Sequence, residues 1–384
     1  MKPQKVSAVI LAAGFSFRLK DFKPLLLLGE MTLLERAIRL FQQNRIRDTQ
    51  VVVGHRSEDL VPLLESSGAR WVVNENYREG MFSSVIAGIS RLDVDREAFF
   101  LLPVDIPLVR PQTIRDLLEA YPKTGQHILY PTFQGRRGHP PLIAAAFAEE
   151  IRLWKGDGGL QSFLGQYETQ SLEVEVADEY ILRDVDTAGD YQELALRYLN
   201  YEIPSIRECR VLLTKKFPIA RPLLEHCQKV AQVALCLAEE LNRSEGQLNL
   251  DLVMAAGLLH DLAKGQPNHA KTGERILKEV GFPAVAKIVG THTDIFPREN
   301  DQLIEEEVLY LADKMVRGNQ LMLLQESYQI AKERFASDPQ TGLVAAKRWA
   351  HAFLIKEKVE KRIGREVHFF LAEPVPNDLF TETW

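Results

Sequence analysis

Short apolar runs alternate with amphipathic segments through the first half of the chain. The apolar runs predict strands at 5–14, 49–55, 70–76, 98–105 and 126–133. The segments between them have helical spacing of apolar residues and predict helices at 31–44, 57–67, 83–92 and 111–121. Such alternation is typical of an α/β domain with a doubly wound, mostly parallel sheet covered by helices on both faces. In these sheets ligands bind at the carboxyl ends of the strands.

The pattern changes after about residue 200, where the strand signal fades. Apolar residues then recur with a helical period, first over 223–241. Further helices are predicted at 250–264, 270–280, 283–292, 302–317, 319–335 and 340–364. The second half is therefore predicted to be all-α. We place two domains at 1–198 and 222–335, separated by a linker at 199–221 and followed by a C-terminal helical extension at 336–384.

Composition narrows the class of protein. A length of 384 residues suffices for two domains, and 46% hydrophobic with 26% charged residues is typical of a soluble globular protein. The net charge of −6 disfavours general binding to nucleic acid or to an anionic membrane. We find no apolar run of about 18 residues, no signal peptide, and no CxxC spacing among Cys209, Cys227 and Cys236. These features predict a cytoplasmic protein that binds neither nucleic acid nor membrane.

The first predicted strand ends in a loop that combines glycine with cations, LAAGFSFRLKDFKPLL. Glycine allows close approach of a ligand, and the backbone N–H groups of such a loop can face phosphate. Arg18 and Lys23 supply fixed positive charge for a triphosphate. The loop matches neither GxGxxG nor GxxxxGK[ST], so neither of these fingerprints applies. The residues expected to meet the nucleotide are Leu11, Ala12, Ala13 and Gly14.

The motif LAAGxSxRLxxxKxLL resembles the signature of nucleotidyltransferases that act on molybdenum cofactor and on sugar phosphates. It is most similar to the molybdenum-cofactor cytidylyltransferases, in which LAAG rather than LAGG accompanies the use of CTP. Further similar segments follow in order across about 5–195. They are NENYREGMFSSVIAG, LLPVDIP, GRRGHPP, GDGGLQSFL and DVDTAGDY. The resemblance implies a fold like that of the nucleotide-diphospho-sugar transferases, although Lys20 stands where the family usually has glycine.

The resemblance also implies roles for individual residues. Gly80, Ser83 and Ser84 would lie near the nucleotide, and Asp105 would bind the catalytic Mg²⁺. Asp186 would be a second oxygen ligand of this ion. From its position alone, Asp186 could equally be the N-cap of the last helix of this half. Both interpretations of Asp186 stay open at the level of sequence.

The implied reaction is nucleotidyl transfer. A phosphate oxygen of the acceptor attacks the α-phosphorus of an NTP in line, and pyrophosphate leaves. Arg18 and Lys23 would stabilise the leaving pyrophosphate. His139 is either a substrate contact or a turn residue before two prolines.

The second half contains an imidazole and a carboxylate side by side, His260 and Asp261, in the apolar segment AAGLLHDLAKG. Buried charge is costly unless it is paired or bound to a metal. His226 and Asp313 also lie on the buried flanks of predicted helices. These two imidazoles and two carboxylates suit Mn²⁺, Fe²⁺, Mg²⁺, Co²⁺ or Zn²⁺, and there is no cysteine among them to select zinc.

The order H…HD…D resembles the metal-dependent phosphohydrolases of the HD domain over about 220–335. The similarity includes Lys264, which follows the HDLA sequence and would meet a phosphate. In such a site the metal lowers the pKa of a bound water, and Asp261 would accept its proton.

Two further histidines, His269 and His292, occupy places where two-metal members of the superfamily have extra ligands. They could hold a second metal, bind substrate phosphate or lie on the surface. Thr293 follows His292, so the usual His-His pair is absent.

We therefore predict a bifunctional enzyme. Its first half would transfer CMP from CTP, or another nucleotide, to molybdopterin, and its second half would be a phosphohydrolase that uses Mg²⁺ or a divalent transition metal. The implied partners are an NTP, a phosphorylated small-molecule acceptor and proteins that mature molybdoenzymes. The alternative is a transferase that acts on a sugar phosphate or another small phosphorylated alcohol, with the HD half as a non-catalytic, nucleotide-sensing regulatory module.

Overall fold

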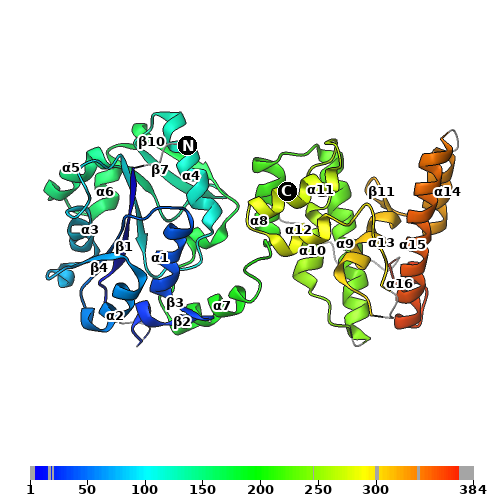
Figure 1. Ribbon diagram of the computed structural model, residues 1–384, viewed down its shortest axis with the longest axis horizontal. Helices are drawn as coiled ribbons and strands as arrows, with labels where there is room; N and C mark the ends of the chain where they lie inside the picture. The colour runs from blue at the N-terminus through cyan, green and yellow to red at the C-terminus, as the bar shows by residue number, and fades with distance from the viewer. Residues whose placement is uncertain are drawn as a thin grey trace. The chain divides into compact units, whose positions relative to one another are not determined.

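The computed structural model describes residues 5–15, 19, 21–244, 246–298, 302–334 and 338–371. The chain folds into two compact units, 1–200 and 201–384 (Figure 1). The prediction of a linker at 199–221 is wrong over much of its length. Helix α8 (Ile206–Val211) and the π-helix Leu212–Lys216 fill this segment, and α8 packs against α10 (Leu250–Leu259) because its apolar side chains are buried.

An eight-stranded sheet forms the centre of the first unit, in the order β10-β7-β9-β6-β1-β4-β5 with β8 paired to β7. The neighbouring strands on the β1 side run parallel, as predicted. They are β1 (Val6–Ala12), β4 (Thr49–Val53), β5 (Arg70–Val73) and β6 (Ala98–Pro103). The other strands are β7 (Ile128–Phe133), β8 (Arg136–Arg137), β9 (Leu142–Ala144) and β10 (Ser171–Glu175). Strand β9, which we did not predict, runs antiparallel to both β6 and β7.

Helices cover both faces of this sheet (Figure 1). One layer is formed by α1 (Leu33–Gln43), α2 (Ser57–Ser67) and α4 (Pro111–Thr124). The other layer is formed by α3 (Met81–Ile89), α5 (Ala148–Leu153) and α6 (Gly159–Gly165). The last helix of the unit, α7 (Ala188–Tyr198), is joined to α1 by the Arg36 guanidinium, which lies 4.1 Å from the centre of the Tyr198 ring. The predicted α/β class of the first half is confirmed.

Described residues of the second unit are helical except for one hairpin and connecting turns, which confirms the predicted all-α class. The helices after α8 and α10 are α9 (Arg221–Arg243), α11 (His269–Glu279), α12 (Pro283–Val289), α13 (Glu305–Met315), α14 (Leu324–Arg334), α15 (Pro339–Ile363) and α16 (Val367–Leu371). Helix α15, predicted as part of an extension, contacts α9, α13 and α14 and belongs to the same unit.

Two details of the second unit differ from the sequence prediction. The predicted helices 302–317 and 319–335 are interrupted by an antiparallel hairpin of β11 (Val316–Arg317) and β12 (Gln320–Leu321). Its turn contains Gly318 at φ +59°, a conformation that favours glycine. The predicted helix 250–264 ends early, at Leu259, so the HD pair lies in the turns that follow α10 and not within the helix.

Helices α9 and α10 approach each other closely at Gly257. A Cβ added there would lie 2.5 Å from the Cα of Ala231 on α9. We therefore expect Gly257→Ala to lower the free energy of unfolding of the second unit by about 1–3 kcal/mol, because the helices must move apart. Urea unfolding measures this loss. In the control Gly165→Ala the added methyl meets no atom within 4 Å, and a loss as large as that of Gly257→Ala would contradict the close approach.

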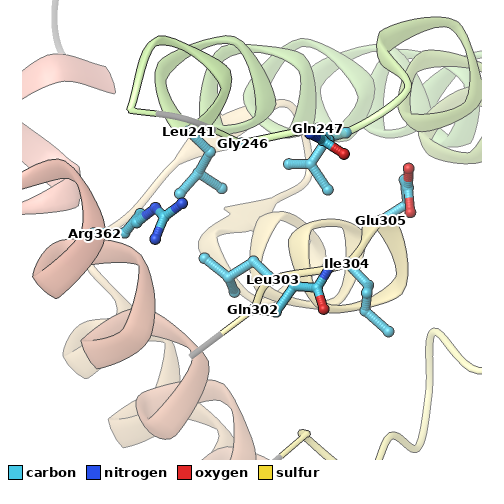
Figure 2. A pocket seen from close by; sticks show the side chains of 9 residues that line it. Leu241, Gly246, Gln247, Gln302, Leu303, Ile304, Glu305 and Arg362 are labelled. Carbon is cyan, nitrogen blue, oxygen red and sulfur yellow. The ribbon is translucent and has the colours of Figure 1, made fainter. Parts of the chain in front are cut away.

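A cavity of about 410 Å³ lies among the ends of α9, α13 and α15 (Figure 2). Leu241, Glu305 and Arg362 are among the residues that line it. None of the predicted metal ligands is among the described residues of its wall, so this cavity is separate from the candidate metal site. Over the ranges that the structure describes, no helix has both the length and the apolar character needed to cross a membrane.

Candidate functional site

The carboxyl end of the sheet brings three of the predicted residues together. Nζ of Lys23 lies 3.2 Å from Oδ2 of Asp105, which follows β6, and 2.7 Å from Oδ1 of Asp186. Helix α7 is capped by Thr187, whose hydroxyl accepts a hydrogen bond from the N–H of Asp190. The alternative interpretation of Asp186 as the N-cap is therefore wrong, and its carboxylate faces Lys23 instead.

This cluster is open to solvent on one side. The side chains of Lys23, Asp105 and Asp186 are 12%, 23% and 34% exposed. Two neighbouring carboxylates are hard oxygen ligands of the kind that Mg²⁺ prefers, and the ammonium between them can meet a phosphate. The predicted residue Arg18 lies outside the described residues, as does Lys20.

The predicted nucleotide segment at the start of α3 is tied to the end of β5. The side-chain amide of Asn74 donates hydrogen bonds to Oγ of Ser83 (2.9 Å) and to Oγ of Ser84 (3.0 Å). Gly80 precedes the helix at φ +103°, and like Gly14 it leaves open space where a Cβ would stand. Asn74 was not among the predicted site residues, although its position just after a strand could have indicated it.

The glycine loop is bordered by an aromatic cluster that sequence reasoning did not identify. The Phe15 ring lies 5.0 Å from the rings of both His55 and Tyr77. The backbone N–H of His55 donates to the carbonyl oxygen of Ala13 at 3.2 Å. A Cβ on Gly54 would lie 2.8 Å from Cβ of Tyr77, so the close packing here requires glycine. The cluster holds the loop against the ends of β1 and β4.

A cavity of about 790 Å³ opens at the same end of the sheet. Phe82 and Tyr130 are prominent in its largely apolar wall. At its edge, the Arg137 guanidinium stacks 4.4 Å from the centre of the Tyr130 ring and donates two hydrogen bonds of 2.8 Å to Glu168, which neutralises its charge. His139 also lines the cavity, and burial lowers the pKa of its imidazole, so the neutral form is favoured.

In the second unit, the four principal predicted ligands converge on one point. Nε2 of His226 lies 3.4 Å from Oδ1 of Asp313 and 3.9 Å from Oδ2 of Asp261. Nε2 of His260 lies 3.6 Å and 3.5 Å from the same two oxygens. The side chains of His260 and Asp261 are almost wholly buried, whereas His226 and Asp313 are 16% and 17% exposed. The set is therefore buried at its base and open at one side.

The two additional histidines join this group through Asp261. Its Oδ1 lies 3.2 Å from Nε2 of His269 and 3.5 Å from Nε2 of His292. The ligand atoms of His226, His260 and Asp261 form one compact set that could hold a metal ion, and those of Asp261, His269 and His292 form another. Asp261 is common to both sets, so one carboxylate could bridge two ions. Neither histidine is a fully exposed surface residue, because His292 is buried and His269 is only 24% exposed.

The imidazoles are oriented by backbone carbonyl groups. A carbonyl only accepts a hydrogen bond, so each bonded Nδ1 carries a proton, and Nε2 is the ring nitrogen left to face the centre. The pairs are His226 with Gly318 (2.8 Å), His260 with Gly257 (2.8 Å) and His292 with Val289 (2.7 Å). Among described residues, Nε2 of His260 and Oδ1 of Asp261 are buried without a hydrogen-bond partner. Buried polar atoms of this kind fit metal ligation.

Two lysines flank the ligand sets. Nζ of Lys264 lies 2.8 Å from Oδ2 of Asp261, and Nζ of Lys314 lies 2.7 Å from Oδ2 of Asp313. Burial alone would raise the pKa of both carboxyls, but His260 beside Asp261 and Lys314 beside Asp313 outweigh it and hold these pKa values far below the usual range. Both carboxylates are therefore charged and able to bind a cation. Lys314 was not predicted, although it directly follows Asp313.

Known families match both units. Residues 8–171 match the model of the MobA-like NTP transferase domain, and residues 223–318 match that of the HD domain. The first curated relatives are matched over only 24% to 32% of their own length.

Curated proteins also resemble part of this chain. The bifunctional protein GlmU of Methylococcus capsulatus is 28% identical over 151 residues, which are 39% of this chain and 32% of that protein. Nicotine blue oxidoreductase of Paenarthrobacter nicotinovorans is 29% identical over 196 residues, 49% of this chain and 96% of that protein. The molybdenum cofactor cytidylyltransferase of Escherichia coli is 26% identical over 194 residues, 50% of this chain and 97% of that protein.

These matches confirm the predicted resemblance of both halves. The fold seen in each unit agrees with them, since the first is an α/β domain built on a mainly parallel sheet and the second is helical. The chain therefore carries a segment that matches the MobA-like NTP transferase domain and, after it in the same polypeptide, a segment that matches the HD domain.

Proposed function

We propose that the first unit transfers CMP from CTP to the phosphate of molybdopterin and releases pyrophosphate. The observation that carries this proposal is the cluster of Lys23, Asp105 and Asp186 at the carboxyl end of the sheet. The similarity to the cytidylyltransferase of Escherichia coli, which extends over 97% of that protein, supports the choice of nucleotide and acceptor.

The residues of this cluster suit the proposed reaction. Asp105 and Asp186 would hold Mg²⁺, which neutralises phosphate charge when it is bound. The acceptor phosphate oxygen forms a bond to the α-phosphorus, and the bond from that phosphorus to the pyrophosphate oxygen breaks. Lys23 stabilises the negative charge that develops on the leaving pyrophosphate, and Ser83 and Ser84, oriented by Asn74, contact the nucleotide.

The cavity beside the cluster supports a flat-ring acceptor over a sugar phosphate. Phe82 and Tyr130 line it in a wall that is largely apolar, and aromatic side chains pack well against a flat ring. The guanidinium of Arg137 is already engaged by Glu168 and is not free to clamp a second anion. We therefore place the ring of molybdopterin in this cavity and its phosphate toward Lys23.

Removal of one aromatic wall tests this placement. Phe82→Ala is expected to raise the KM for molybdopterin about twofold to tenfold, because a ring contact of about 0.5–1.5 kcal/mol is lost. The KM for CTP should stay nearly constant. Steady-state rates of pyrophosphate release at varied acceptor concentration measure the change. Phe296→Ala, at a phenylalanine that is 77% exposed in the other unit, is the control. An unchanged KM for molybdopterin in Phe82→Ala would contradict the placement.

The acceptor itself is tested by a panel at fixed CTP and Mg²⁺. Molybdopterin should support pyrophosphate release, whereas glucose 1-phosphate and N-acetylglucosamine 1-phosphate should not. Faster release with either sugar phosphate would favour the alternative of a sugar-phosphate transferase.

For the second unit we propose a metal-dependent phosphohydrolase. His226, His260, Asp261 and Asp313 would hold one divalent ion, which supplies a hydroxide from bound water when present. Asp261 would accept the proton of that water, while Lys264 and Lys314 meet the oxygens of the phosphate. The convergence of all these groups favours catalysis over a non-catalytic nucleotide-sensing module, which has less need of the full ligand set.

Metal analysis of the purified full-length chain distinguishes the two roles of the second unit. A hydrolase is expected to retain a transition metal or Mg²⁺ and to release inorganic phosphate from phosphate esters. Nucleotide binding without retained metal and without phosphate release would favour the sensor.

A further inference from the structure

The hairpin of β11 and β12 connects two of the candidate metal ligands. Helix α13, which carries Asp313, runs directly into β11. At the turn of the hairpin, the carbonyl oxygen of Gly318 accepts a hydrogen bond from Nδ1 of His226 on α9 (2.8 Å). The next side chain, Asn319, donates to Oε2 of Glu225 at 3.3 Å. Two adjacent residues of the turn thus bind two adjacent residues of α9.

His226 differs from the other oriented histidines in the origin of its partner. His260 and His292 each bond to a carbonyl three residues earlier in their own segment. The partner of His226 lies 92 residues away in sequence, because His226 is within a helix whose nearby carbonyl groups serve the helix itself. The orientation of His226 therefore depends on the hairpin.

The geometry of the turn depends on glycine. Gly318 has φ +59°, and a Cβ at this position would meet no atom within 4 Å. A side chain would therefore be excluded by backbone conformation and not by crowding. Because a β-branched residue is strongly disfavoured at such a φ, valine would move the turn and with it the carbonyl that faces His226. The residue is exposed, so this change leaves the core of the unit in place.

We propose that Gly318 is a positioning residue of the HD metal centre. Its carbonyl holds His226 in the form protonated at Nδ1, which keeps the lone pair of Nε2 directed toward Asp313 and Asp261. The hairpin thereby links the place of Asp313 at the end of α13 to the orientation of His226 on α9. This inference rests on the metal site proposed above for the second unit.

The test is a titration of Co²⁺ into the metal-free full-length protein, followed by visible absorption. The signal that is lost in His226→Ala identifies the site that contains His226. Gly318→Val should weaken Co²⁺ binding at this site about tenfold or more, as loss of an outer partner of a ligand does. Gly364→Val is the matched control, because Gly364 also has positive φ (+73°) and open space around it, at the end of α15. This control should keep the Co²⁺ affinity within about twofold of the parent protein, below the tenfold loss expected of a lost partner.

One further variant completes the test. Asn319→Ala removes the second contact with α9, should lower the affinity by less than Gly318→Val, and provides the test if Gly318→Val does not fold. Unchanged Co²⁺ affinity in Gly318→Val would overturn the role of Gly318 without contradicting the metal site. If only Asn319→Ala folds, unchanged affinity in that variant has the same meaning. Absence of any Co²⁺ signal that depends on His226 would overturn the metal site itself.

Discussion

Replacement of Asp261 by asparagine is expected to lower the affinity of the second unit for divalent metal by more than about 100-fold, beyond the loss typical of an outer partner. Asp261 belongs to both ligand sets, with Oδ2 facing His226 and His260 and Oδ1 facing His269 and His292. An amide presents one neutral oxygen where the carboxylate presents two charged ones. The change therefore weakens both sets at once and removes the proton acceptor of the proposed hydrolysis.

Metal content after dialysis and the rate of phosphate release measure this prediction in the full-length chain. Asp251→Asn, at an exposed residue in the first turn of α10, is the control and should keep metal and activity. His269→Ala should lose metal only from the set that contains His269 and His292. Retention of the full metal content by Asp261→Asn would contradict the bridging position of this carboxylate.

A second large effect is expected in the first unit, where Asp105→Asn should slow pyrophosphate release by about 10³-fold. The substitution removes a charged oxygen from the cluster at the end of β6, where Lys23 also contacts Asp186. Since the proposed reaction depends on neutralising the charge of the triphosphate, the loss should fall on kcat more than on the KM for CTP.

Asp95→Asn is a suitable control for this effect, because Asp95 is 54% exposed and precedes the opposite, amino end of β6. Its rate should equal that of the parent protein. Metal retained by the second unit should be the same in both variants. If the rate for Asp105→Asn lies within about tenfold of the parent rate, the loss is far smaller than one lost electrostatic contact causes. That result would show that Asp105 is not part of the catalytic cluster.

Much of the fold is predictable because the two halves have different hydrophobic periods. The parallel strands β1, β4, β5 and β6 and the long helix α9 follow directly from these periods. Strand β9 was missed because it is only three residues long, and strand β10 was missed because only Leu172 and Val174 of its sequence SLEVE are apolar. The β11–β12 hairpin was missed because two-residue strands are too short to interrupt a helical pattern.

The candidate sites could be predicted where they consist of side chains, because the sequence shows the type of each side chain. The resemblance had indicated these residues one by one, and the structure shows which of them lie together. Lys23 contacts Asp105 and Asp186, and His226 lies close to Asp313. The role of Gly318 could not be predicted, because a backbone carbonyl is the same in every residue and only the folded turn directs it. The aromatic ring packing of Phe15, His55 and Tyr77 likewise arises only when the ends of the strands meet.

Transfer of CMP from CTP to molybdopterin, which we propose for the first unit, is tested most directly by phosphorus NMR. The protein is studied with Mg²⁺, molybdopterin and each of the four NTPs in turn. We expect free pyrophosphate and a new diphosphate linkage, fastest with CTP and only when molybdopterin is present. No pyrophosphate with any NTP, or equal rates with all of them, would contradict it.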